Sequence, residues 1–122
     1  MAENKQYVTQ VQDNGSVYIS EEVIGTIVGH AVKDVEGVIG LTAKPGAEII
    51  ELIGKKNWSK GMKITIGEDD SICVDCQIVI AYGHSVVTVA QNVQNAISSA
   101  LESMIGIRVS AVNVNVCGIS RQ

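Results

Sequence analysis

Two stretches of the chain, residues 20–37 and 85–106, place apolar side chains at three- and four-residue intervals. This spacing puts the apolar side chains on one face of a helix. Each stretch opens with a serine and closes with a glycine, which are common residues at the N-terminal and C-terminal caps of helices. The pattern therefore predicts one amphipathic helix in each stretch, and the second is the more regular.

Alternating apolar and polar positions between these stretches predict β-strands. A turn-forming Gly67-Glu68-Asp69-Asp70 lies between two of the predicted strands, which indicates an antiparallel hairpin. The order of elements predicts an α+β fold, a mixed sheet with two principal helices packed on one face. The predicted strands cover residues 15–19, 38–41, 62–66, 71–81 and 107–117.

A length of 122 residues predicts one domain. Residues 1–14 are polar and lack periodicity, so we expect a flexible N-terminal lead-in there. The α+β domain is predicted over 15–118, with a C-terminal tail over 119–122. Within the irregular part of the domain, Ile49–Ile53 is predicted to make one or two helical turns.

The charge balance narrows the function classes. A net charge of −4 gives no general attraction to nucleic acid. A G-x-x-G pattern at Gly37–Gly40 matches the RNA-binding loop of KH domains, but its middle is apolar, so no nucleic-acid partner is expected. The chain shows no apolar run long enough for direct membrane insertion and no signal peptide, so we expect a cytoplasmic protein.

Cys73-Val74-Asp75-Cys76 has the C-x-x-C spacing of zinc clasps and redox pairs. Here the motif lies within a predicted strand, where residues three apart point to opposite faces. We therefore interpret both cysteines as ordinary strand residues and expect no metal and no cofactor.

An alternative hypothesis is a thiol- or metal-dependent enzyme, in which Cys73 or Cys117 works with a histidine. The two histidines are His30, on the polar face of the first predicted helix, and His84, directly before the second. Because neither lies in a recognisable catalytic context, we expect surface or cap residues and no catalytic group.

A lysine-rich segment surrounds the chain's only tryptophan. One interpretation is a docking patch for an acidic partner or anionic headgroups, and the other is a solvated loop whose tryptophan packs into the core. The residues of this patch are Lys55, Lys56, Trp58, Lys60 and Lys63.

Four segments occur in an order that resembles the alkaline shock, or envelope stress response (general stress), family of Gram-positive bacteria. They are GSVYISEEVIGTIVGHAVKDVEGVIGL, KGMKITI, VDCQIVIAYGHSVVTVAQNVQNAISSALESMIGI and VSAVNVNVCGI, which together run from Gly15 to Gly118. The resemblance implies a small α+β domain for which no catalytic or metal residues are defined. It also implies cytosolic stress proteins, some of which self-associate and some of which are held near the membrane by a membrane-anchored protein.

The resulting prediction is a non-enzymatic, self-associating interaction protein that supports the envelope stress response or envelope homeostasis. A membrane-anchored partner would bring it near the membrane. Besides the thiol or metal enzyme, a regulatory protein linked to lipid metabolism stays open as an alternative, because the resemblance also implies that some subgroups of the family are tied to fatty-acid or lipid metabolism.

Overall fold

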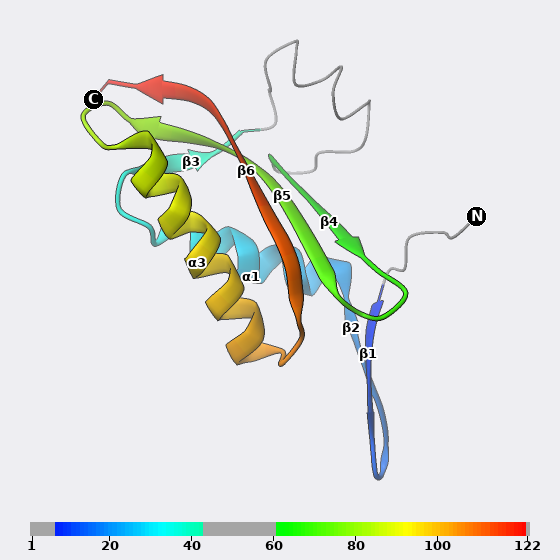
Figure 1. The fold of residues 1–122 in the computed structure, drawn as a ribbon. Helices are drawn as coiled ribbons and strands as arrows, with labels where there is room; N and C mark the ends of the chain where they lie inside the picture. The colour runs from blue at the N-terminus through cyan, green and yellow to red at the C-terminus, as the bar shows by residue number, and fades with distance from the viewer. Residues whose placement is uncertain (1–6, 43–60, 122) are drawn as a thin grey trace.

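The computed structural model describes residues 7–42 and 61–121. The described part of the chain begins with a two-stranded hairpin and continues into a four-stranded sheet with two helices (Figure 1). The elements are β1 (Tyr7–Gln12), β2 (Gly15–Ser20), α1 (Glu21–Lys33), β3 (Val38–Leu41), β4 (Met62–Ile66), β5 (Ile72–Ala81), α3 (Val86–Met104) and β6 (Val109–Ser120).

Strand β5 is the centre of the four-stranded sheet. Along one edge it pairs antiparallel with β4 through its first half and with β3 through its last residues. Along the other edge it pairs with β6, and this pairing is parallel. The mixed sheet predicted from the sequence is therefore confirmed.

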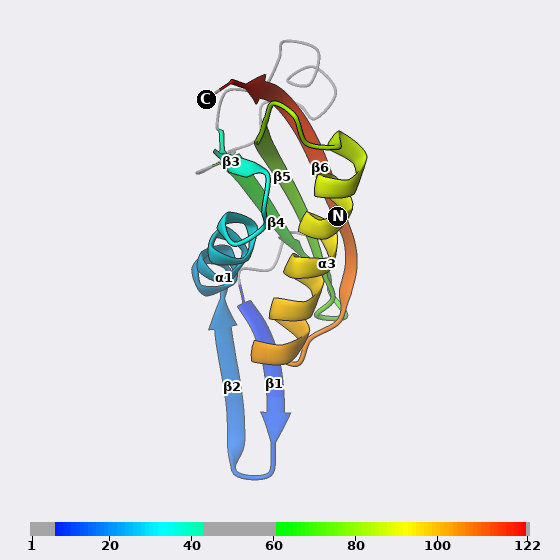
Figure 2. The same cartoon turned by 90° about the vertical axis from the view of Figure 1, so that its left-hand side faces the viewer.

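Both helices lie on one face of this sheet, as predicted (Figure 2). Each begins at the serine expected from the sequence. Ser20 Oγ accepts a hydrogen bond from the amide of Val23, and Ser85 Oγ accepts one from the amide of Thr88. These bonds satisfy amides that have no partner within the first turn of a helix.

The hydrophobic core lies between the helices and the sheet. Strand β5 supplies every second side chain to it, because alternate residues of a strand point to the same face. The fully buried core residues of β5 are Ile72, Val74, Cys76, Ile78 and Ile80, and those of the helices include Ile24, Val28, Val32, Val93, Ile97 and Leu101.

The prediction of a lead-in without regular structure is wrong over Tyr7–Gln12, which form β1 and pair with β2 along their whole length. Val8 is fully buried, and the side chain of Gln10 donates a hydrogen bond to the carbonyl of Ile105 after α3. These two contacts hold β1 against the domain. Strand β6 also runs into the predicted tail, to Ser120, whereas the turns predicted over Ile49–Ile53 lie outside the described residues.

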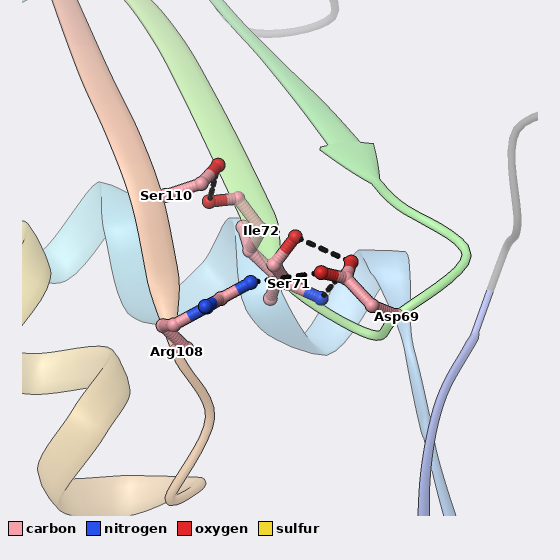
Figure 3. A network of polar contacts seen from close by, with 5 residues as sticks. All are labelled: Asp69, Ser71, Ile72, Arg108 and Ser110. Atoms are coloured by element: carbon pink, nitrogen blue, oxygen red, sulfur yellow. Dashed lines mark hydrogen bonds and ion pairs between the residues drawn. The ribbon is translucent and has the colours of Figure 1, made fainter.

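A polar network joins the turn before β5 to the start of β6 (Figure 3). The Asp69 carboxylate accepts hydrogen bonds from the Ser71 amide (3.2 Å) and hydroxyl (2.7 Å), and it forms an ion pair with Arg108 (2.8 Å). The Ser110 hydroxyl donates to the Ile72 carbonyl (3.1 Å). The network fixes where the parallel strand β6 begins alongside β5.

Asp69→Asn is expected to lower the melting temperature modestly at pH 7, because the hydrogen bonds from Ser71, and to a lesser extent Arg108, hold the pKa of the Asp69 carboxyl below its usual 3.8. A carboxylate whose pKa is lower in the folded state stabilises that state above pH 3.8, and this contribution is lost as the pH falls through the folded-state pKa.

The difference in melting temperature between wild type and Asp69→Asn should therefore shrink below pH 3.8. Thermal melts of both proteins at several pH values measure it. Glu68→Gln removes the same charge from the neighbouring exposed position and is the control. An equal loss of stability in both variants would show that general charge, and not the network, is responsible.

Candidate functional site

The sheet face that points away from the helices carries polar side chains from three strands. The strand registers align Lys63 of β4, Asp75 of β5 and Asn113 of β6 in one row. The Asn113 side-chain amide donates a hydrogen bond of 2.9 Å to the Asp75 carboxylate. Because the row holds one cation, one anion and one amide, it balances its own charge and forms no strongly acidic or basic patch.

The three cysteines divide between the two faces of the sheet, and Cys73 and Cys76 lie on opposite faces as their spacing predicts. Cys76 is buried in the core, whereas Cys73 and Cys117 are half-buried on the opposite face. The Asn113 amide lies 3.8 Å from the Cys73 sulfur. The Cys117 thiol donates to Gln77 and to the Asn115 carbonyl. Within the described residues, no group of three or more His, Cys, Asp or Glu side chains could hold a metal ion.

The environments of Cys73 and Cys76 disfavour the thiolate. Burial, reinforced by the Asp75 carboxylate, raises the pKa of Cys76 to about 12. Burial, again with Asp75, also raises the pKa of the Cys73 thiol. Catalytic cysteines need a lowered pKa, because the thiolate is the nucleophile.

We expect Cys76 to resist an aromatic disulfide reagent in the native protein at pH 8 and to react at once after denaturation. Because the pKa of Cys76 is raised from 9.0 to about 12, the folded state also loses stability as the pH rises between these values. Labelling followed by peptide mass spectrometry assigns each modified residue. Rapid native labelling of Cys76 would contradict the buried, protonated thiol.

The two histidines lie in or directly before the helices. His30 is exposed in the last turn of α1. His84 precedes α3 and packs beside Gly37, where a Cβ atom would lie 3.0 Å from the His84 Nδ1. The hydrogen bonds described above join Cys73 to Asn113 and Cys117 to Gln77 and the Asn115 carbonyl, and none of these bonds involves a histidine.

Gln77 is a structural residue that the strand pattern did not single out. It is the one polar side chain fully buried among the described residues. Its Nε2 donates to the Thr42 carbonyl (3.3 Å), and its Oε1 lies 3.9 Å from the Cys117 thiol. These contacts join the end of β3 to the middle of β5 and to β6. In the sequence, the signal for this role is a glutamine among the apolar residues of a predicted strand.

The β1–β2 hairpin presents an uncharged outer face. It extends away from the sheet and helices (Figures 1 and 2). The strand register places Tyr7, Val11 and Tyr18 on this face, where their side chains are 51%, 80% and 66% exposed. Exposed tyrosines on an uncharged strand face are typical of protein–protein interfaces, so this face is a candidate docking surface.

Most of the lysine-rich patch, namely Lys55, Lys56, Trp58 and Lys60, lies outside the described residues. Lys63 belongs to β4 and lies opposite Asp75 in the sheet register. Lys63 is therefore part of the charge-balanced row.

The model of the alkaline shock protein 23 family, described as having a cell envelope-related function, matches residues 9–121 of the chain. The chain belongs to this family. The match confirms the resemblance to the alkaline shock family that the sequence segments indicated. Similar proteins occur in the Gram-positive bacteria Bacillus subtilis and Streptococcus pyogenes.

The uncharacterized proteins YloU and YqhY of Bacillus subtilis (strain 168) are 33% and 34% identical to this chain. Each alignment covers 86% of the chain, with 88% of YloU and 77% of YqhY. A stress response regulator gls24 homolog of Streptococcus pyogenes serotype M3 is 26% identical over 86% of the chain and 59% of its own length.

Among solved structures, one of MamM-CTD aligns with this chain with a TM-score of 0.49 and 16% sequence identity. The alignment covers 84% of this chain and 98% of that one.

No helix within residues 7–42 and 61–121 has the length and apolar character needed to cross a membrane.

Proposed function

We propose that this member of the alkaline shock protein 23 family is a non-enzymatic, self-associating interaction protein. In this proposal it supports the cell envelope by binding a membrane-anchored protein. The observation that carries the proposal is the outer face of the β1–β2 hairpin, where Tyr7, Val11 and Tyr18 are exposed together on an uncharged surface. Covering these side chains would stabilise a two-stranded hairpin, which on its own is marginal in water.

The chemistry of the cysteines supports binding over catalysis. The raised pKa of Cys73 and the pKa of about 12 for Cys76 leave both thiols protonated at neutral pH. In the polar row, the Asp75 carboxylate accepts a hydrogen bond from Asn113, and Lys63 lies opposite Asp75 in the strand register. The raised pKa of Cys73 disfavours a thiol-dependent enzyme that would use this residue as its nucleophile.

The experiment is affinity capture of the tagged chain from its own cells, with soluble and membrane fractions analysed separately by mass spectrometry. The proposal predicts an untagged second copy in both fractions and a near-stoichiometric membrane-anchored protein in the membrane fraction. Recovery of lipid-synthesis enzymes in place of a membrane protein would favour the regulatory alternative. Recovery of the tagged chain alone would contradict the proposal.

Charge reversal of Lys55, Lys56 and Lys60 to Glu tests the docking patch. If the patch binds an acidic partner, the triple variant should lose that partner in the same capture experiment, because attraction becomes repulsion. Capture equal to wild type would rule the patch out. The control makes the same change in charge elsewhere in the chain, at Lys5, Lys33 and Lys44.

A further inference from the structure

We propose that the outer edge of β6 pairs antiparallel with β6 of a second copy, so that two sheets join into one across a twofold axis. This inference deepens the proposed function, because it rests on self-association and names the surface that performs it. Three features carry it: the composition of the edge, the direction of its backbone groups and the helix beside it.

Within the described residues, strand β6 lies at an edge of the sheet and has none of the usual protection in its sequence. Among the described strands it pairs with β5 alone. Natural edge strands are commonly kept from pairing with other chains by lysines, prolines or shortness. The 12 residues of β6 include no charged residue and no proline. Two register shifts lie toward its ends, and the stretch Ala111–Val116 between them pairs with β5 without interruption.

The hydrogen bonds show which backbone groups of β6 face outward. Backbone polar groups of successive strand residues point to opposite edges. The Val112 carbonyl accepts a hydrogen bond of 3.0 Å from the Gln94 side chain of α3 and therefore points to the outer edge. By alternation, Val114 and Val116 direct their backbone N–H and C=O groups to the same edge. A twofold axis at Asn115 would place Val114 opposite Val116 of the second copy.

The side of α3 next to this edge carries no charged residue between Val87 and Ser98. Gln94 contacts β6, and Val87, Gln91 and Ser98 lie seven, three and four residues from it, so they share the same side of the helix. In an antiparallel pairing, the two α3 helices would run beside one another along this side. Val87 is an exposed apolar residue there.

These features favour a second copy over a different partner. A twofold contact must be self-complementary. A β-strand edge and the amides of Gln and Asn meet this requirement, because each offers both donors and acceptors. The chain carries a net charge of −4, but β6 and residues 87–98 of α3 carry no charge, which lets two copies approach there with little repulsion. The same surface offers nothing to neutralise a strongly charged partner.

Gln91→Lys tests the surface without altering the core, because residue 91 is exposed. It places like charges close together across the proposed axis, so the dissociation constant of the dimer should rise about tenfold or more. The control is Asn92→Lys, which adds the same charge to the adjacent exposed residue, turned about 100° around the helix. Sedimentation equilibrium measures both constants. An equal effect of the two variants would overturn the proposal.

Val114→Pro tests the strand edge itself. Proline removes the outward N–H, and edge strands tolerate proline where that group does not pair within the sheet. The variant should fold and be monomeric. Amide exchange of the wild type, followed residue by residue by NMR, keeps the test valid if Val114→Pro fails to fold.

In the wild type, exchange at Val114 and Val116 should slow as the protein concentration rises, whereas Asn113 and Asn115 should be protected by β5 at every concentration. Self-association without slower exchange at Val114 and Val116 would show that the edge of β6 is not the contact between copies. The proposed function would still stand. A monomer at all concentrations would overturn both. If exchange at these residues slowed only when another captured protein was added, the outer edge of β6 would be the binding site of that protein. This result would contradict pairing with a second copy.

Discussion

Replacement of Gly37 by alanine is expected to destabilise the fold by roughly 2–6 kcal/mol. Gly37 lies between α1 and β3 and has a φ of +96°, which is unfavourable for residues with a side chain. An alanine Cβ would also lie 2.9 Å from Val89 Cγ2 and 3.0 Å from His84 Nδ1. Backbone strain and the crowding of α3 would add together. Urea unfolding of wild type and variant measures the loss.

Gly83→Ala separates these two contributions. Gly83 has a φ of +102°, and no atom lies within 4 Å of the position that its Cβ would take. Only the backbone strain is therefore expected there, roughly 1–3 kcal/mol. If Gly37→Ala were no more destabilising than Gly83→Ala, α3 would not pack closely against the turn that contains Gly37.

Leu101→Ala is expected to cost roughly 2–5 kcal/mol, because it leaves a cavity in a core that cannot fully collapse. Leu101 is completely buried on the face of α3 that packs against the sheet. The adjacent Glu102 is exposed, so Glu102→Ala is the control and should change the stability by no more than about 0.5 kcal/mol. The two values come from denaturant unfolding. Similar values for the two variants would contradict the assigned orientation of α3.

Local chemistry made much of the fold predictable. The serine caps at Ser20 and Ser85 and the face of each helix follow from side-chain type and spacing within one element. The division of Cys73 and Cys76 between opposite faces follows from strand alternation and is confirmed by the burial of Cys76. Strand alternation alone was therefore enough to predict that Cys73 and Cys76 are ordinary strand residues.

Features that depend on distant residues were harder to predict. Strand β1 was missed because its alternation of apolar and polar residues is weak. It is held in place by the burial of Val8 and by the contact of Gln10 with Ile105, which is far away in the sequence. The parallel pairing of β6 with β5 and the hydrogen bond from Gln94 also join separate segments. Consequently the outer edge of β6, which carries the proposed contact, could be identified only from the assembled sheet.

In the function proposed above, this chain works by associating with protein surfaces, beginning with its own. Sedimentation velocity of the full chain, from nanomolar to high micromolar concentration, tests this self-association. We expect a sedimentation coefficient that rises with concentration from that of a monomer to that of a dimer or larger assembly. A coefficient that stays at the monomer value throughout the range would contradict it.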